Sequence, residues 1–136
     1  MKQYLLDTDV CIEILRHNEK VIEKVEAVGR KNCFVSEITI AELFYGAAKS
    51  ARQEQFQDVV YIQRFFEVVP QYSSLRQYGI LKADLEAQGM MIGEFDLLIG
   101  ACAVENHLVV VTSNVKHFSH IPNLIIEDWA KKSKKV

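Results

Sequence analysis

The chain has 136 residues, and 49% of them are hydrophobic, which is enough to bury a continuous core in one domain without disulfides or a structural metal. The net charge of −2 argues against a protein that binds nucleic acid through bulk positive charge alone. No apolar run approaches the roughly 18 residues that span a bilayer, so we expect neither an anchor nor a signal peptide, and a cytoplasmic protein. A single domain is expected over residues 1–136, with the basic segment 131–136 as a solubilising tail.

The first half of the chain predicts strands that alternate with helices. Hydrophobic periodicity indicates strands at residues 3–6 and 32–35, a short strand at 68–69, and helices from after Asp9 to Arg16, at 19–28, at 39–48 and at 51–67. Gly29 follows the helix at 19–28, as a helix C-cap does.

The second half continues this alternation. Helices are predicted at 73–88 and 94–106, and strands at 108–111 and 124–126. The strand at 108–111 is apolar throughout, as a strand buried on both faces is. The whole pattern predicts an α/β fold with a mainly parallel sheet covered by helices on both faces. In such a sheet, ligands bind beyond the carboxyl ends of the strands.

The three cysteines, Cys11, Cys33 and Cys102, are odd in number and widely separated in the sequence. They lie among apolar residues and form no C-x-x-C motif. We therefore expect reduced thiols in the core.

Acidic residues follow the first predicted strand and begin two of the predicted helices. Asp7 comes directly after the strand and Asp9 lies two positions on, where either carboxylate can cap the next helix; capping is the stronger alternative for Asp9. Glu42 lies one turn into a helix, and the run from Thr39 matches a capping box that ends on Glu42. The same position also places Glu42 at the edge of the sheet where Asp7 emerges.

Two further polar groups are expected at this edge. Asp96 and Glu94 lie in the first turn of an apolar helix, where the helix dipole alone favours an acid. The strand at 108–111 opens into Thr112, Ser113 and Asn114, and a turn there would explain Asn114 without any function.

The functional interpretation of these acids depends on their being close together in the folded chain. A parallel sheet brings its strand ends together although Asp7, Glu42 and Asp96 are far apart in the sequence. Two carboxylates 4 Å apart repel by about 4 kcal/mol at an effective dielectric of 20, so converging acids need protons or cations. Mg²⁺ or Mn²⁺ suits an all-oxygen ligand set and could activate water against a phosphodiester. The acids therefore predict a metal-dependent nuclease.

Sequence blocks around these acids resemble a known family. The blocks are YLLDTDVCIEIL, VSEITIAELFYGAA, MIGEFDLLIGACAVEN and VVVTSNVKHFSHIPNLIIEDW. In this order they resemble the four blocks of the PIN domain, and specifically the VapC toxins of bacterial and archaeal toxin–antitoxin pairs. The resemblance covers nearly the whole chain and implies a PIN-like three-layer α/β/α sandwich.

The resemblance also implies roles for the polar residues. Asp7, Glu42 and Asp96 would be the catalytic, metal-binding acids of an endoribonuclease that uses Mg²⁺ or Mn²⁺. Asn114 stands where many PIN domains have Asp, which leaves the choice between one and two metal ions open. The auxiliary positions are Glu94 and Asp9, together with hydroxyl groups that would orient the acids, although capping or turn bonds explain these hydroxyls equally well: Thr8, Ser36 and Thr112.

Partners and substrate follow from the same resemblance. It implies a homodimer and a cognate VapB-type antitoxin that occludes the site, with operator DNA contacted only through the antitoxin. Cleavage of structured RNA, initiator tRNA in particular, would inhibit translation.

Two other groups of residues have simpler interpretations. His117 and His120 lie in a predicted loop without further ligands, and we interpret them as surface residues. A set of aromatic residues could form a groove for a partner helix, but their helical spacing is typical of core residues, and we expect about half of them to be buried: Phe44, Tyr45, Tyr61, Phe65 and Phe66.

Two rival functions remain. A strand followed by Asp7, Thr8 and Asp9 also resembles the nucleophile motif of haloacid-dehalogenase-like phosphatases, which need a Lys and a later acid pair. Lys116 is the only candidate for that Lys, and no acid pair follows the strand at 108–111. The second rival is a catalytically inert PIN module that only binds.

Overall fold

The computed structural model describes residues 1–131 and contains a sheet of five parallel strands in the order β3-β2-β1-β4-β5. The strands are β1 (Tyr4–Leu6), β2 (Cys33–Ser36), β3 (Glu67–Val69), β4 (Val109–Val111) and β5 (Ile126–Glu127). All of the strands expected from the sequence are present. The last one begins two residues later than predicted, because the carbonyl of Ile125 and the carbonyl of Glu127 accept the hydrogen bonds from β4 and the residue after it. The predicted tail lies outside the described residues from residue 132 on.

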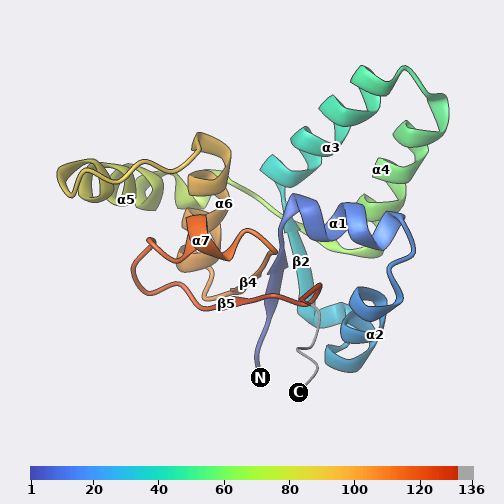
Figure 1. Cartoon of the computed structure of the whole chain (residues 1–136), viewed down its shortest axis with the longest axis horizontal. Helices are drawn as coiled ribbons and strands as arrows, with labels where there is room; N and C mark the ends of the chain where they lie inside the picture. Colours follow the sequence, from blue (N-terminus) through green and yellow to red (C-terminus); the bar gives the residue numbers. More distant parts are fainter. Residues whose placement is uncertain (132–136) are drawn as a thin grey trace.

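Helices cover both faces of this sheet, which confirms the three-layer α/β/α arrangement (Figure 1). One layer is formed by α1 (Thr8–Leu15), α2 (Glu19–Val28), α3 (Glu37–Ser50) and α4 (Gln53–Phe65). The other contains α5 (Leu75–Ala87), α6 (Glu94–Glu105) and α7 (Val115–Phe118). Short 3₁₀ turns, η1 (Arg30–Asn32) and η2 (Tyr72–Ser74), precede β2 and α5. In Figure 1, α3 and α4 lie side by side and project beyond the sheet.

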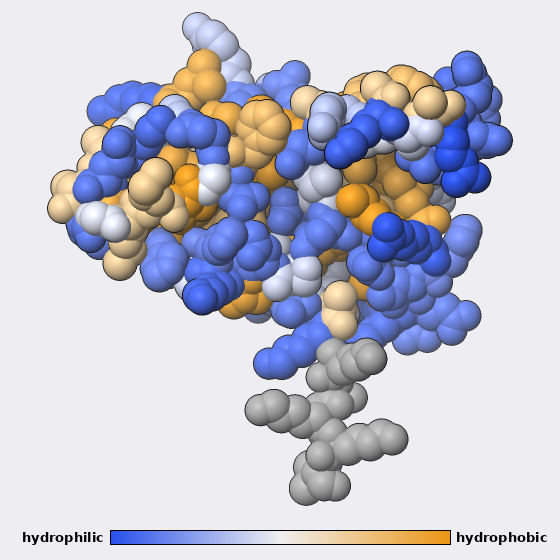
Figure 2. Space-filling view, turned by 45° about the horizontal axis from the view of Figure 1, so that its top comes forward, coloured by the Kyte–Doolittle hydropathy of each residue, from blue (hydrophilic) through white to orange (hydrophobic). Residues whose placement is uncertain are grey.

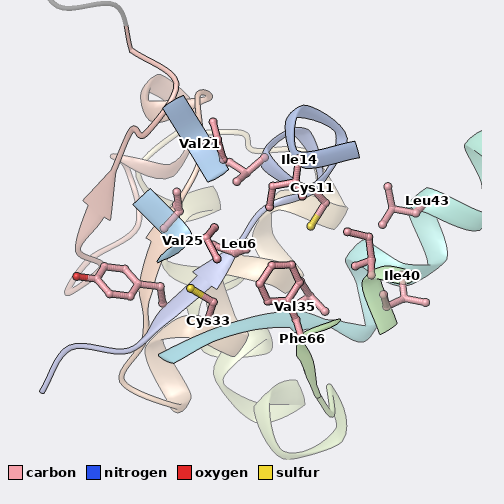
Figure 3. Packing of buried hydrophobic residues seen from close by; sticks show 14 of the residues in the cluster. Leu6, Cys11, Ile14, Val21, Val25, Cys33, Val35, Ile40, Leu43 and Phe66 are labelled. Carbon is pink, nitrogen blue, oxygen red and sulfur yellow. The ribbon is translucent and has the colours of Figure 1, made fainter. Parts of the chain in front are cut away.

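Side-chain alternation along the strands divides the core into two clusters. On β1, Tyr4 and Leu6 pack against the α1–α4 layer, whereas Leu5 packs against the layer of α5 and α6. The same alternation on β4 sends Val110 to the second cluster. This is the period of two that a strand imposes on its side chains. Figure 3 shows the first cluster, where Leu6 meets side chains of α1 and α2.

The boundaries of α3 and α4 differ from the sequence prediction for identifiable reasons. The helix predicted to begin at Thr39 begins at Glu37, because the hydroxyl of Ser36 accepts a hydrogen bond from the Thr39 amide at 3.0 Å and caps the helix. The helix predicted at 51–67 begins later, because Ala51 adopts a left-handed conformation with φ of 57°. It also ends earlier, because the backbone is already extended at Phe66.

The cysteines behave as expected. Cys11, Cys33 and Cys102 are all buried and none forms a disulfide. Burial raises the pKa of the Cys33 thiol to about 12 and that of the Cys102 thiol to about 11, so both stay protonated and unreactive at neutral pH. Within residues 1–131, no helix combines the length and apolar character that a membrane span requires.

Truncation of a central strand residue tests this description of the core. Leu6 is fully buried between α1, α2 and the neighbouring strands. We expect Leu6→Ala to lower the free energy of unfolding by about 2–5 kcal/mol, measured by urea denaturation. Leu75→Ala is the matched control, because this side chain on α5 is exposed and its loss should change stability by less than about 0.5 kcal/mol. Equal effects of the two variants would contradict the assigned core.

Candidate active site

Asp7 lies at the centre of the carboxyl edge of the sheet, between the ends of β1 and β4. Its Oδ1 accepts a hydrogen bond from the Thr8 amide at 2.7 Å, and its Oδ2 accepts one from the Thr112 hydroxyl at 2.8 Å. The side chain is buried, with 5% relative exposure. Asp7 is therefore the cap of α1, and the preference for Asp9 as the cap was wrong. The Thr112 hydroxyl makes both of the bonds that the sequence left open, because it donates to Asp7 and also accepts a turn bond from the Asn114 amide at 2.9 Å.

Asp9 is the second residue of α1, and its side chain connects the end of β1 to the segment that follows β4. Its Oδ2 accepts hydrogen bonds from the backbone amide of Ser113 at 3.2 Å and from the hydroxyl of the same residue. Its other oxygen, Oδ1, is buried and has no hydrogen-bond partner among the described residues. An unpaired buried carboxylate oxygen is costly unless a further group binds it.

Glu42 approaches the same edge from α3. Its Oε1 accepts a hydrogen bond from the Thr8 hydroxyl at 2.6 Å. The capping-box hypothesis for Glu42 was wrong, because Ser36 caps α3 and Glu42 lies more than a turn inside the helix. Ser36 is thus a helix cap, whereas Thr8 connects Glu42 to the start of α1, directly after its N-cap Asp7.

Asp96 completes the group from the first turn of α6. Its Oδ2 lies 3.3 Å from Nδ2 of Asn114 and 3.5 Å from Nδ1 of His117, and its side chain is one-quarter exposed. Asn114 therefore contacts an acid of the site instead of only forming a turn. His117 was interpreted as a surface residue, but it lies at the rim of this site. Its spacing of three residues from Asn114 would have indicated this if α7 had been predicted.

Glu94 lies apart from these acids. Its carboxylate pairs with Lys82 at 2.6 Å and accepts a hydrogen bond from the hydroxyl of Tyr78. These contacts lower the pKa of Glu94, with the Lys82 hydrogen bond as the main cause. The structure therefore does not bring Glu94 into the group to which the sequence assigned it.

The remaining acids repel one another. The pKa of Asp7 is raised from 3.8 to about 7, mainly by burial and then by the negative charges of Asp9 and Asp96, against the opposing effect of its hydrogen bonds. The pKa of Glu42 is raised by burial and by Asp96 and Asp9, against the hydrogen bond from Thr8. Among residues 1–131, no Lys or Arg forms an ion pair with any of these four acids. Among the described residues, the site therefore concentrates negative charge that no Lys or Arg neutralises.

These side chains fit a hard divalent cation that keeps part of its hydration shell. The available ligand atoms are carboxylate oxygens, which Mg²⁺ and Mn²⁺ prefer. One of these oxygens, Oδ1 of Asp9, has no hydrogen-bond partner among the described residues. Within the described residues, no group of three or more His, Cys, Asp or Glu side chains is arranged so that it could hold a metal ion as it stands. Mg²⁺ does not require one, because proteins usually bind it through one or two carboxylates together with water.

Comparison with known proteins identifies the family of the chain. The family model of the PIN domain matches residues 4–124. Ribonuclease VapC2 of Rickettsia felis is 36% identical over 132 residues, which cover 94% of this chain and 98% of the relative. The chain belongs to the VapC ribonucleases of the PIN-domain family. A second VapC relative, the tRNA(fMet)-specific endonuclease of Salmonella typhimurium, is 33% identical over 95% of this chain and 99% of its own length.

Solved VapC structures share the fold over nearly the whole chain. The VapBC2 complex of Rickettsia felis, bound to a DNA fragment from its promoter, superimposes with a TM-score of 0.84 at 36% identity and covers 93% of this chain and 98% of that one. The DNA-bound VapBC complex of Salmonella typhimurium gives the same TM-score at 30% identity, over 96% and 100% of the two chains. The PIN-like fold expected from the sequence is thereby confirmed.

The five aromatic residues considered for a groove, which lie in α3, in α4 and at the residue after α4, are less buried than expected. Only Phe66 is fully buried, Phe44 and Phe65 pack at the margin of the core, and Tyr45 and Tyr61 are exposed. Phe65, Phe66 and Tyr61 line a pocket of about 270 Å³ between α1, α2 and α4. Exposed apolar side chains also lie among the hydrophilic ones on the face shown in Figure 2.

The charge repulsion around Asp7 predicts a pH-dependent effect of its removal. The raised pKa means that the folded state resists ionisation of Asp7, so the wild type loses stability as the pH rises from about 4 to about 7. Asp7→Asn avoids this cost. In EDTA, we expect the variant to be more stable than the wild type at pH 8 by about 2–4 kcal/mol, and the difference to shrink toward pH 4.

Urea denaturation at both pH values measures this effect. Asp84→Asn, which alters an exposed aspartate on α5, is the control and should differ from the wild type by the same small amount at both pH values. A difference between Asp7→Asn and the wild type that does not change with pH would show that the acids do not repel one another as described.

Proposed function

We propose that this protein is a metal-dependent endoribonuclease in which Asp7, Glu42 and Asp96 hold Mg²⁺, with Mn²⁺ as a substitute. The observation that supports this most strongly is the gathering of acids from α1, α3 and α6 around the buried Asp7, without a Lys or Arg ion pair among the described residues. A cation that binds such a group relieves the repulsion between the carboxylates and does not have to displace a Lys or Arg from them.

Each acid is held by a neighbouring donor. Thr112 and the Thr8 amide hold Asp7, the Thr8 hydroxyl holds Glu42, and Asn114 holds Asp96. These bonds fix the carboxylates against their mutual repulsion, so that little reorganisation is needed when a cation and a phosphate arrive. A bound Mg²⁺ supplies a Lewis acid that lowers the pKa of a water and stabilises the charge that develops on the phosphodiester.

Initiator tRNA is the proposed substrate. The support is the Salmonella typhimurium relative, whose name specifies tRNA(fMet), together with the near-complete length of the match. Cleavage of that tRNA would stop translation initiation, which is the effect expected of a toxin.

A VapB-type antitoxin is the proposed partner. Both VapBC structures superimpose on this chain over more than nine-tenths of its length, and both hold DNA. We propose that the antitoxin occludes the acidic site of a VapC homodimer and that the complex contacts operator DNA through the antitoxin. A cytoplasmic location is proposed with it.

The two rival functions are less well supported. The phosphatase hypothesis needs a Lys beside the acids, and no described Lys pairs with them. The chain also matches the PIN-domain family and a VapC ribonuclease, not a phosphatase. An inert binding module would not require the acids to stay unneutralised.

Cleavage assays on RNA test the proposal. We expect the protein to cut tRNA in Mg²⁺ or Mn²⁺, to stop in EDTA, and to lose at least about 100-fold in rate after Asp7→Asn, Glu42→Gln or Asp96→Asn, because each change removes a charge that holds the ion. Glu94→Gln is the matched control, because Glu94 pairs with Lys82 outside the group, and its activity should stay near that of the wild type.

Three results would contradict the proposal. They are cleavage that is unaffected by EDTA, a loss in Glu94→Gln as large as that in Glu42→Gln, and hydrolysis of p-nitrophenyl phosphate without cleavage of RNA. Circular dichroism on each variant excludes unfolding as the cause of lost activity.

A further inference from the structure

The side chains of Asn114, His117 and Asp96 form a small hydrogen-bonded group at the rim of the site. Nδ2 of Asn114 lies 2.9 Å from Nδ1 of His117 and 3.3 Å from Oδ2 of Asp96. The direct separation between His117 and Asp96 is longer, at 3.5 Å. Because hydrogen bonds weaken as the donor–acceptor separation grows, the shorter contact with Asn114 is the main interaction of the imidazole.

The chemistry of the three groups fixes which atoms donate. A carboxylate only accepts, so Asn114 must turn its NH₂ group toward Asp96. The second hydrogen of that NH₂ group points to Nδ1 of His117. Nδ1 must then accept, which places the imidazole proton on Nε2.

This arrangement leaves the amide oxygen of Asn114 unengaged. Both hydrogens of the amide are directed, and Oδ1 has no hydrogen-bond partner among residues 1–131. Asn often caps a helix with its side chain, but Asn114 makes no such bond at the start of α7. The amide is thus held by His117 and Asp96 instead of by its own helix.

Packing places His117 beside Asn114. The His117 amide donates to the Asn114 carbonyl at 3.2 Å, so one turn of α7 sets the imidazole next to the Asn114 side chain. Phe118 is fully buried and anchors α7 against α6. An added Cβ on Gly100, one turn beyond Asp96, would clash with Ile121, which shows how closely α6 approaches the segment that follows α7.

We propose that His117 is a positioning residue that orients the amide of Asn114 through Nδ1, so that the NH₂ group holds Asp96 and Oδ1 stays directed away from both. The inference rests on the proposed function, because it assigns His117 a part in the same acidic site. Oδ1 is a hard oxygen donor, suited to a metal-bound water or to a hydroxyl of the RNA backbone.

The tautomer of His117 tests the geometry without any activity. Long-range ¹H–¹⁵N NMR correlations on the wild type at pH 8 in EDTA should show the proton of His117 on Nε2. Asn114→Ala should weaken that preference, while the signals of His120, an exposed histidine three residues on, should not change. A proton on Nδ1 in the wild type would overturn the proposal.

Kinetics on tRNA in Mg²⁺ test the role. Asn at position 117 can present an amide oxygen near the place of Nδ1, whereas Gln reaches the place of Nε2. We expect His117→Ala and His117→Gln to lower kcat about tenfold with little change in KM, and His117→Asn to recover most of the rate. His120→Ala is the control and should match the wild type. In an Asn114→Ala background, His117→Ala should have no further effect.

The alternative outcomes are distinct. Activity in His117→Gln but not in His117→Asn would mean that Nε2 contacts the RNA, and would overturn the proposed role. Losses that add in the double variant would do the same, because His117 would then act independently of Asn114. A wild type that cuts no RNA would refute the proposed function, and the NMR result would still decide the orientation of His117.

Discussion

Repulsion between carboxylates at one edge of a parallel sheet is the constraint on which the site depends. Burial of Asp7 at that edge, together with the negative charges of Asp9 and Asp96, raises its pKa to about 7. The protein compensates with hydroxyl and amide donors that fix the positions of the acids but leave their total charge unchanged. Ionisation of these acids therefore costs folding stability, and a cation at the proposed site would offset that cost.

The fold supplies the convergence that no single segment of the chain could provide. β1 and β4 are adjacent and parallel, so Asp7 and Thr112 emerge side by side although 105 positions separate them. α3 and α6 lie in opposite layers and bring Glu42 and Asp96 toward the same edge. A well-packed apolar sheet is what holds these polar groups together, because the hydrophobic core provides the free energy that the charged edge costs.

The sequence was enough to predict the five strands, the helices other than α7, and the covering of the sheet on both faces, and it placed Asp7, Glu42 and Asp96 at one edge of that sheet. Those predictions depended on long apolar periodicities and on the rule that parallel strands place their ends at one edge. The local hydrogen-bond partners were harder to predict. Asp9 and Asp7 compete for one cap, and only the backbone path shows that Asp7 takes it. Ser36, not Thr39, caps α3, and this choice moves Glu42 out of the capping box.

Two further residues show why side-chain roles escape a sequence. Glu94 lies two residues before Asp96, but successive residues on a helix point in different directions, and Lys82 lies within reach of Glu94. His117 belongs to a helix of only four residues, Val115–Phe118, which is too short for periodicity to reveal. Neither outcome depends on composition; each is set by tertiary contacts.

The location of a bound cation tests the central claim most directly. A crystal of the protein grown with Mn²⁺ and measured at the manganese absorption edge would reveal every ordered ion by its anomalous signal. The account predicts a peak at the carboxyl edge, bonded to carboxylate oxygens of at least two of Asp7, Glu42 and Asp96. The absence of an anomalous peak at the carboxyl edge of the sheet, with the ion bound elsewhere or not at all, would contradict it.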